Sequence, residues 1–320
     1  MEDRIPNNRV AYGRALVAVG EKYPEVVALE ADLGKGTQSV LFRERFPDRY
    51  FPIGIAEANM MGIAAGLAAS GKIPFASTFC VFASMRAVEQ LRNSIAYPRL
   101  NVKVVATNAG IEIGPDGATH QAIEDIAIIR AIPNMTLLVP SDPPMTMKEI
   151  HMVAAMEGPT YVRIGRQDTP YLYDDNLKLE LGKAVVARPG DDVTIMAIGN
   201  MVCRALTAAD ILAGEGISAR VLDMFSIKPL DEAAIIQAAE ETGCIVTAED
   251  HNILGGLGGA VAEVLCSGRP VPLVRIGVRD VFAQSGSSED LLRHYGMTPE
   301  TIAEAARTAL RRRDSLRKLN

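Results

Sequence analysis

The sequence predicts an α/β protein with two doubly wound domains, and three observations support this prediction. Short β-branched runs alternate with longer Ala-rich stretches of helical length, which is typical of parallel sheets covered on both faces. The polar, non-periodic segment QDTPYLYDDNLKLELG interrupts the alternation between about 167 and 182, and the alternation then restarts. The length of 320 residues is enough for one large or two ordinary domains.

The first half of the chain carries the clearer alternation. Runs of about four to eight Val, Ile, Leu and Thr residues favour strands, and longer periodic stretches favour helices. We expect strands at 26–29, 51–53, 73–77, 102–107, 135–139 and 160–164, and helices at about 36–46, 56–70, 81–96, 119–131 and 143–156.

The second half repeats the pattern after the polar segment, which we interpret as an interdomain linker. We expect strands at 193–198, 217–222, 244–248 and 271–275, and helices at about 201–214, 231–241, 256–267, 289–295 and 299–315. The predicted division is a first domain over 1–170, a linker over 171–190 and a second domain over 191–320.

Composition excludes several classes of function. Lys and Arg number 33 against 39 Asp and Glu, for a formal charge of −6 without a basic stripe, so nucleic acid is not an expected partner. The sequence has no apolar run long enough to cross a membrane and no signal-peptide pattern at its start. Its four widely spaced cysteines fit reduced thiols better than a disulfide frame or a metal site. We therefore expect a cytoplasmic protein.

Glu57 is the first candidate site residue, because it is the only ionisable residue between Phe51 and Ser70. It stands where a strand-like run passes into a helix of small residues. A carboxylate in such apolar surroundings loses hydration, which disfavours its charged form unless a partner compensates. The side chain is either a buried acid/base or cofactor ligand, or an exposed first-turn residue that complements the helix dipole. The helix itself is suited to close packing in the core or at a subunit interface.

The second candidate is the loop IEIGPDGATHQ, residues 111–121. It follows the strand expected at 102–107, and ligands bind beyond the carboxyl ends of strands in open parallel sheets. Asp116 and His120 are expected at the mouth of this loop, and Thr119 could cap the next helix. The alternative is an ordinary Gly-Pro-Asp-Gly turn without a binding role.

Two further features have structural alternatives of their own. Phe79 and Phe82 are three residues apart, which places them on one face of a helical turn. From this spacing alone, core packing is favoured over a binding role. Arg166 ends the segment GPTYVRIGR after a predicted strand. It suits bidentate capture of a phosphate, or it is a surface arginine.

The glycine run at 255–259 does not predict dinucleotide binding. In the G-x-G-x-x-G frame that starts at Gly256, the third glycine would fall at position 261, which is Val261. No acidic residue ends the following predicted strand to meet a ribose. Tight helix–strand packing accounts better for these glycines.

Taken together, several segments resemble the C-terminal half of the transketolase family of thiamine diphosphate enzymes. They occur in the family's order across nearly the whole chain, which makes the set specific although each segment alone is modest evidence. The segments are EADLGKG (30–36), GIAEANMMGIAAGLA (54–68), STFCVF (77–82), GPDGATHQAIEDIAIIRAIPNMTLLVPSD (114–142), GPTYVRIGR (158–166) and AEDHNILGGLGGAVAE (248–263).

The resemblance implies a pyrimidine-binding domain followed by a transketolase C-terminal domain. The family's diphosphate-binding domain, whose Gly-Asp-Gly stretch supplies metal ligands, has no counterpart in this sequence. The resemblance therefore implies one subunit of a split transketolase, without metal ligands of its own. Its expected partner is the N-terminal, diphosphate-binding subunit, which would hold the diphosphate and Mg²⁺ (or Ca²⁺) in a two-plus-two assembly.

The resemblance also implies roles for individual residues. Glu57 matches the glutamate that donates to the aminopyrimidine ring of thiamine diphosphate, and Phe79 and Phe82 match the aromatic positions packed on that ring. Asp32 matches an aspartate near the thiazolium side of the cofactor. The remaining residues match positions that contact the sugar phosphates. Asp116 and His120 match residues that bind the donor sugar, and His120 would also assist proton transfer. Arg166 and Arg9 match the arginines that bind the phosphate of the acceptor.

Three positions depart from the family pattern. Asn108 stands where the sugar-phosphate enzymes of the family carry His. Gly36 stands where they carry a phosphate-binding Ser, and Met85 stands where they often carry Tyr. The Asn108 and Gly36 departures alter the donor pocket or the phosphate clamp, so we expect a less common ketose phosphate or a related anionic sugar as substrate.

The leading hypothesis is therefore transfer of a two-carbon ketol unit from a ketose phosphate to an aldose phosphate. Within the superfamily the alternatives are 1-deoxyxylulose-5-phosphate synthase-like chemistry and a 2-oxoacid decarboxylase beta-type subunit. An alternative of another class is a binding or scaffold subunit that has lost catalysis, and the presence of Glu57, Asp116 and His120 argues against it.

Overall fold

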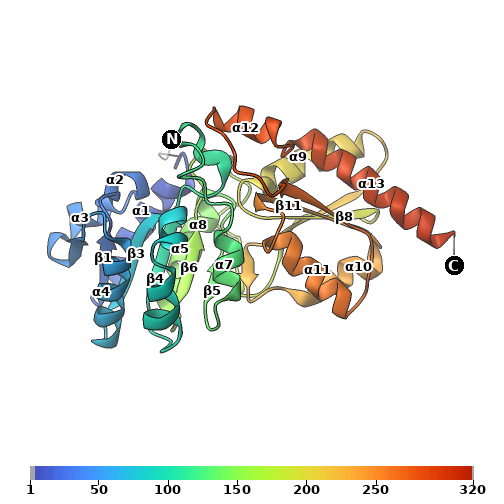
Figure 1. The fold of residues 1–320 in the computed structure, drawn as a ribbon. Coiled ribbons are helices and arrows are strands. Elements are labelled where there is room, and N and C mark those ends of the chain that lie inside the picture. Colours follow the sequence, from blue (N-terminus) through green and yellow to red (C-terminus); the bar gives the residue numbers. More distant parts are fainter. Residues whose placement is uncertain (1–3, 319–320) are drawn as a thin grey trace.

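The computed structural model describes residues 4–318, which form two helix-covered sheets side by side (Figure 1). Both sheets are mainly parallel, each with one antiparallel edge strand. The predicted α/β class with two doubly wound units is thereby confirmed. Within the described part of the chain, no helix is long and apolar enough to cross a membrane.

The first sheet has the strand order β10-β5-β6-β4-β3-β1-β2. Its strands are β1 (Val26–Glu30), β2 (Tyr50–Pro52), β3 (Ile73–Phe79), β4 (Lys103–Thr107), β5 (Thr136–Leu138), β6 (Thr160–Arg163) and β10 (Ser226–Lys228). The helical segments of this half are α1 (Asn8–Lys22), α2 (Gly34–Thr37), α3 (Val40–Arg45), η1 (Pro47–Arg49), α4 (Glu57–Ala69), α5 (Cys80–Met85), α6 (Val88–Gln90), η2 (Leu91–Ala96), η3 (Ile111–Asp116), α7 (Asp125–Ala131) and α8 (Pro143–Ala155).

Alternate residues of the first sheet enter two different cores, as the two-residue period of a strand requires. In β1, Val26 and Ala28 pack with α1 and α8 on one face, whereas Val27 and Leu29 pack with α4 and α7 on the other. Strands buried on both faces have apolar residues at nearly every position, which explains why the sequence shows them as continuous runs.

The second sheet has the order β12-β11-β8-β9-β7. Its strands are β7 (Val185–Arg188), β8 (Val193–Ala197), β9 (Ala219–Asp223), β11 (Ile245–Asn252) and β12 (Leu273–Val278), and its helices are α9 (Met201–Ala213), α10 (Glu232–Glu241), α11 (Leu257–Ser267), α12 (Ser288–His294) and α13 (Pro299–Arg317). Helices α9, α12 and α13 pack on one face of this sheet, and α10 and α11 pack on the other.

The chain between the two sheets is docked rather than free. The backbone N–H groups of Leu172 and Tyr173 donate to the Asp142 carboxylate over 2.8 and 2.9 Å. The side chains of Tyr173 and Leu177 pack against the core on the α1 and α8 face of the first sheet. Strand β7, within the range 171–190, pairs with β9.

Several predicted elements differ from those observed. The sequence prediction missed α1, although Asn7 caps it by accepting from the N–H of Val10. The helix predicted at 36–46 is divided at Gln38, which has φ +67°. The helix predicted at 81–96 is split into α5, α6 and the π-helical segment η2.

The helix predicted at 119–131 begins only at Asp125. The preceding backbone has other partners: the carbonyl of Ala122 accepts from Gly110 N–H, and the carbonyl of Ile123 accepts from Asn252 N–H. Thr119, expected to cap this helix, instead forms a hydrogen bond between its hydroxyl and Nδ1 of His120 over 2.9 Å.

Candidate active site

Most of the predicted site residues lie at the carboxyl edge of the first sheet, because they follow or end a parallel strand. Arg9 instead lies in α1, before the first strand. Phe79 ends β3, Asn108 follows β4, and Arg166 follows β6. Glu57 opens α4 after β2. Parallel strands bring their carboxyl ends to one edge, where ligands bind in open α/β sheets. The topology therefore gathers residues that are far apart in sequence.

The Glu57 carboxylate is buried, with 3% of the side chain exposed. It forms an ion pair with Arg86, whose Nη1 donates to Oε1 over 3.0 Å. The exposed first-turn alternative is therefore excluded. Arg86 is the compensating partner that burial of a carboxylate requires, and sequence analysis did not identify it.

Phe79 and Phe82 form a small apolar cluster with Ile113, separate from the larger cores. Their rings are stacked with centroids 5.9 Å apart and an interplanar angle of 17°. The His120 imidazole meets the Phe82 ring edge-on, with centroids 5.3 Å apart. The structure thus joins the aromatic pair to the loop that carries His120.

Gly36 packs against the same cluster. A Cβ atom at this position would lie 3.0 Å from the Phe79 ring, which is closer than ordinary van der Waals contact. A side chain at position 36 would therefore require the Phe79 ring to shift by a few tenths of an ångström.

Two arginines belong to the predicted site: Arg166 contacts the predicted substrate loop, and Arg9 contacts the segment after β1. Arg166 forms an ion pair with Asp116 at 2.9 Å and donates to the carbonyl of Ile113 over 2.7 Å. Arg9 donates to the carbonyl of Gly36 over 3.0 Å. Burial lowers the pKa of Arg9, and the positive charge of Arg166 lowers this pKa further. Two guanidinium groups close enough to oppose each other favour an anion between them.

Asn108 and Asp32 both have a left-handed backbone, with φ of +61° and +60°. Asn108 is buried, and its Oδ1 has no hydrogen-bond partner among residues 4–318. This oxygen is therefore available to accept a hydrogen bond from a group outside the chain. Asp32 is exposed, and no hydrogen bond or ion pair joins it to the other predicted site residues in the described range.

Sequence analysis missed the residues that hold the substrate loop from the second sheet. The carboxylate of Asp250, in β11, accepts from the backbone N–H groups of Ile111 and Glu112 over 2.9 and 3.2 Å. Ser288, at the start of α12, donates to the carbonyl of Glu112 over 2.7 Å, and α12 lies beside this loop in Figure 1. The AEDHN segment was the available signal, because it contains Asp250.

The glycine run at 255–259 has the packing role that the sequence predicted. The buried Glu249 carboxylate accepts from the N–H groups of Leu257 and Gly258 at the start of α11. A Cβ at Gly256 would lie 2.0 Å from Oε2 of Glu249. The helix start is therefore already occupied by a carboxylate of the chain itself.

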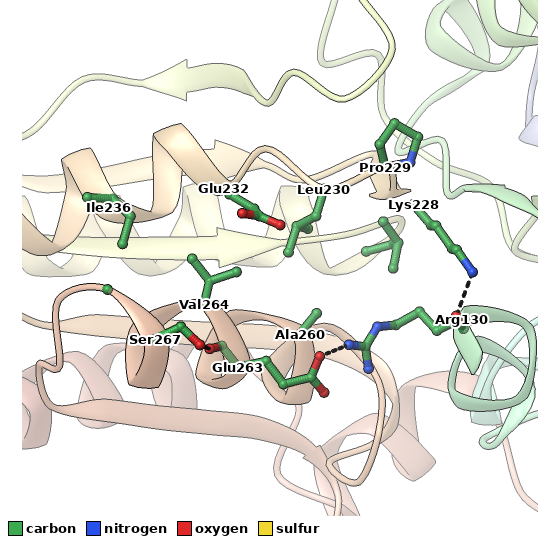
Figure 2. A pocket seen from close by; sticks show the side chains of 12 residues that line it. Arg130, Lys228, Pro229, Leu230, Glu232, Ile236, Ala260, Glu263, Val264 and Ser267 are labelled. Atoms are coloured by element: carbon green, nitrogen blue, oxygen red, sulfur yellow. Dashed lines mark hydrogen bonds and ion pairs between the residues drawn. The ribbon is translucent and has the colours of Figure 1, made fainter. Parts of the chain in front are cut away.

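A cavity of about 630 Å³ lies near the C-terminal end of α7, between α10 and α11 (Figure 2). Three of the charged side chains that line it, Arg130, Lys228 and Glu263, have partners within the chain. Nζ of Lys228 donates to the carbonyls of Arg130 and Ile132, and Arg130 pairs with Glu263. This cavity contains none of the predicted site residues. Among the described residues, no cluster of His, Cys, Asp and Glu could hold a metal ion.

Two family models match the chain. Residues 5–171 match the pyrimidine-binding domain of transketolase, and residues 182–302 match the transketolase C-terminal domain. Together they cover most of the sequence.

Individual proteins agree with these matches. A Methanocaldococcus jannaschii protein, provisionally named a transketolase C-terminal section, is 50% identical over 299 residues, covering 92% of this chain and 94% of that protein. A 6-deoxy-6-sulfo-D-fructose transketolase subunit of Clostridium sp. (strain MSTE9) is 43% identical over 306 residues, covering 96% and 95% of the two chains. A solved split-gene transketolase, described as an inactive β4 tetramer, has a TM-score of 0.89 and 48% identity, covering 96% of this chain and 99% of that chain.

Proposed function

The chain belongs to the transketolase family, and from this premise we propose that it is the pyrimidine-binding subunit of a split transketolase. The proposed reaction transfers a two-carbon ketol unit from a ketose phosphate to an aldose phosphate. The observation that carries the proposal is a buried carboxylate, Glu57, linked through Arg86 to the aromatic cluster of Phe79 and Phe82.

These residues fit the aminopyrimidine half of thiamine diphosphate, the cofactor of this family. Glu57 offers a carboxyl group shielded from water, and Phe79 and Phe82 offer stacked aromatic surface beside it. When bound, the cofactor supplies an electron sink for cleaving the bond next to a carbonyl. Glu57 would hold a proton at a nitrogen of the ring, and the phenylalanines would exclude water and set the plane of the ring.

The substrate side is proposed to contain Asp116, His120, Arg166, Arg9 and Asn108. His120 lies against Phe82, so it borders the proposed ring site and could move a proton at the substrate carbonyl. Arg9 and Arg166 suit an anionic group. The unpartnered Oδ1 of Asn108 could accept from a sugar hydroxyl. Asp32 is proposed to act on the thiazolium side of the cofactor.

The anionic group of the substrate need not be a phosphate. The Clostridium relative is named for a sulfonated sugar, and a sulfonate offers the same negatively charged oxygens to arginine as a phosphate does. This supports a ketose phosphate or a related anionic sugar as donor.

The second polypeptide is proposed to be the N-terminal, diphosphate-binding subunit, which would hold the diphosphate and Mg²⁺ (or Ca²⁺). Support comes from relatives that match this chain almost from end to end and are themselves a C-terminal section and a split-gene product. The four cysteines are free, which agrees with the proposed cytoplasmic location.

Self-association is proposed to use the outer face of α4, giving two copies of each subunit. Ile63 on α4 and Ile55 just before it are exposed, and a Cβ at Gly62 or Gly66 would meet no atom within 4 Å. Small residues allow two helices to approach closely. Light scattering of Gly62→Gln/Gly66→Gln should report a smaller assembly than the native chain. An unchanged mass would place the contact elsewhere.

The function is tested by reconstitution with the diphosphate-binding subunit and an assay of ketol transfer, with and without thiamine diphosphate. Activity should require both subunits and the cofactor, and Glu57→Ala should lower kcat by at least about a hundredfold. Turnover unchanged by Glu57→Ala would contradict the proposed role. Release of carbon dioxide from a 2-oxoacid would favour the decarboxylase alternatives.

A further inference from the structure

Arg86 lies at the junction of the two parts of the proposed cofactor site. Its Nη1 donates to Oε1 of Glu57 over 3.0 Å, and its Cζ lies 4.0 Å from the centroid of the Phe82 ring. One guanidinium therefore makes an ion pair and a cation–π contact at the same time. The side chain is half exposed, whereas Glu57 is almost fully buried.

The guanidinium resembles an aminopyrimidine in the contacts it makes. Both groups are flat, both carry N–H donors, and both can lie on an aromatic face while bonding to a carboxylate. The proposed function assigns to the cofactor ring a contact with Glu57 and a contact with the aromatic pair. In this structure Arg86 makes both contacts.

The surroundings of Phe82 leave little room for a second flat group. Phe79 is stacked beside Phe82, His120 meets it edge-on, and Arg86 covers it at 4.0 Å. As a result, only 8% of Phe82 is exposed. An incoming ring must displace one of these neighbours, and Arg86 is the half-exposed one with a long, flexible stem.

Charge gives a second reason for displacement. Arg86 already donates to Oε1 of Glu57, whereas the proposed function gives this carboxyl group to the cofactor ring. An incoming ring would therefore compete with the charged guanidinium of Arg86 for the same carboxylate.

We propose that Arg86 is a displaceable placeholder that occupies the pyrimidine site of the unassembled subunit and leaves it when the cofactor ring enters. This inference rests on the proposed function, because it takes Glu57 and Phe82 as the site of that ring. The placeholder keeps a buried carboxylate paired and an aromatic cluster covered until the partner brings the rest of the site.

The test measures binding rather than turnover. The full chain is titrated by calorimetry with 4-amino-5-hydroxymethyl-2-methylpyrimidine, a probe that carries the cofactor ring without the diphosphate. Arg86→Ala should bind this probe about three- to tenfold more tightly than the native chain, since the probe no longer competes with an ion pair and a cation–π contact. Arg86→Lys, which keeps the charge without the flat group, should fall between the two.

Arg92→Ala is the matched control, because Arg92 is an exposed arginine nearby that pairs with Asn93. It removes the same charge and should leave the affinity unchanged. Equal or weaker probe binding by Arg86→Ala would overturn the placeholder. The same enhancement in Arg92→Ala would also overturn it, because the effect would then come from net charge.

Phe82→Ala separates this inference from the proposed function. If Phe82→Ala and Glu57→Ala both bind the probe as the native chain does, the site itself is misplaced and the proposed function fails. If both lose binding while Arg86→Ala gains none, the site stands and the placeholder fails. In the complex with the partner subunit and Mg²⁺, stopped-flow mixing should also show faster binding of thiamine diphosphate by Arg86→Ala.

Discussion

Gly36 lies against Phe79 in this structure, at a position where related sugar-phosphate enzymes are expected to carry serine. A Cβ there would come within 3.0 Å of the aromatic ring, so a side chain would force the ring to move. Gly36→Ser should therefore weaken thiamine diphosphate binding in the complex about threefold to tenfold and lower the unfolding free energy by about 1 kcal/mol. Calorimetry and denaturant unfolding measure the two effects.

Gly259→Ser is a matched control, because a Cβ at that position meets only Nη1 of Arg130, at 3.8 Å. It should change neither quantity by much. If Gly36→Ser instead binds a sugar phosphate more tightly with cofactor binding unchanged, position 36 acts on the substrate and not through Phe79.

Glu149 is a buried acid with no hydrogen-bond partner for either carboxylate oxygen among the described residues. Burial raises the pKa of Glu149 well above its usual value, and the nearby charges of Asp223 and Asp142 raise this pKa further. The folded protein therefore binds this proton more tightly than the unfolded chain does. Stability from this group is fully present below the usual pKa of a glutamate and is lost as the pH rises.

Glu149→Gln should remove this loss of stability at higher pH, because an amide does not ionise. Relative to the native protein, the unfolding free energy of the variant should rise between pH 5 and pH 8, by about 1–3 kcal/mol. Urea unfolding at both pH values checks this. Any constant cost of the amide cancels in the comparison. A difference between variant and native protein that stays the same at both pH values would show that Glu149 binds the same number of protons in the folded and the unfolded chain, which would contradict the predicted effect.

At the scale of elements, the loop with Asp116 is held by residues of the second half of the chain. Asp250 accepts two backbone N–H groups of this loop, and a Cβ at Gly110 would overlap its carboxylate. Asp250→Ala should lower the unfolding free energy by about 2–4 kcal/mol, because it leaves buried N–H groups unpaired. It should also speed amide exchange in 111–116.

Asp250→Asn keeps the shape and one acceptor, so its effect should be smaller than that of the alanine variant. Hydrogen exchange read by mass spectrometry distinguishes the loop from the rest of the chain. If exchange in 111–116 is as slow in Asp250→Ala as in the native protein, the loop is held by other contacts.

Local patterns predicted the described strands except β7 and β10, because residues buried on both faces, such as 104–106 of β4 and 195–197 of β8, form apolar runs. They predicted helix lengths less well. The helix expected from residue 119 starts at Asp125 because Ala122 and Ile123 bond to distant backbone, and no local pattern contains that information. The same limit applies to the site: Glu57 was recognisable as a lone charge, but its partner Arg86 is 29 residues away.

At the scale of the whole molecule, the two sheets are not independent. Strand β10 belongs by sequence to the second half, yet it pairs antiparallel with β5 of the first sheet. One continuous core contains residues of both halves, among them Leu137 and Ile227. The edge of the first sheet is thereby covered by the second half, which leaves less of it available for unwanted pairing.

A shared core predicts that both halves unfold together. Ile227→Ala, at the junction, should lower the unfolding free energy by about 2–4 kcal/mol through the cavity it leaves, and amides of β3 and β8 should gain exchange by the same factor. Ile302→Ala lies in the core between the second sheet and helices α9, α12 and α13; it is the comparison and should also speed exchange in both strands. If β8 amides exchange faster in either variant while β3 amides do not, the halves unfold separately and the continuous core does not couple them.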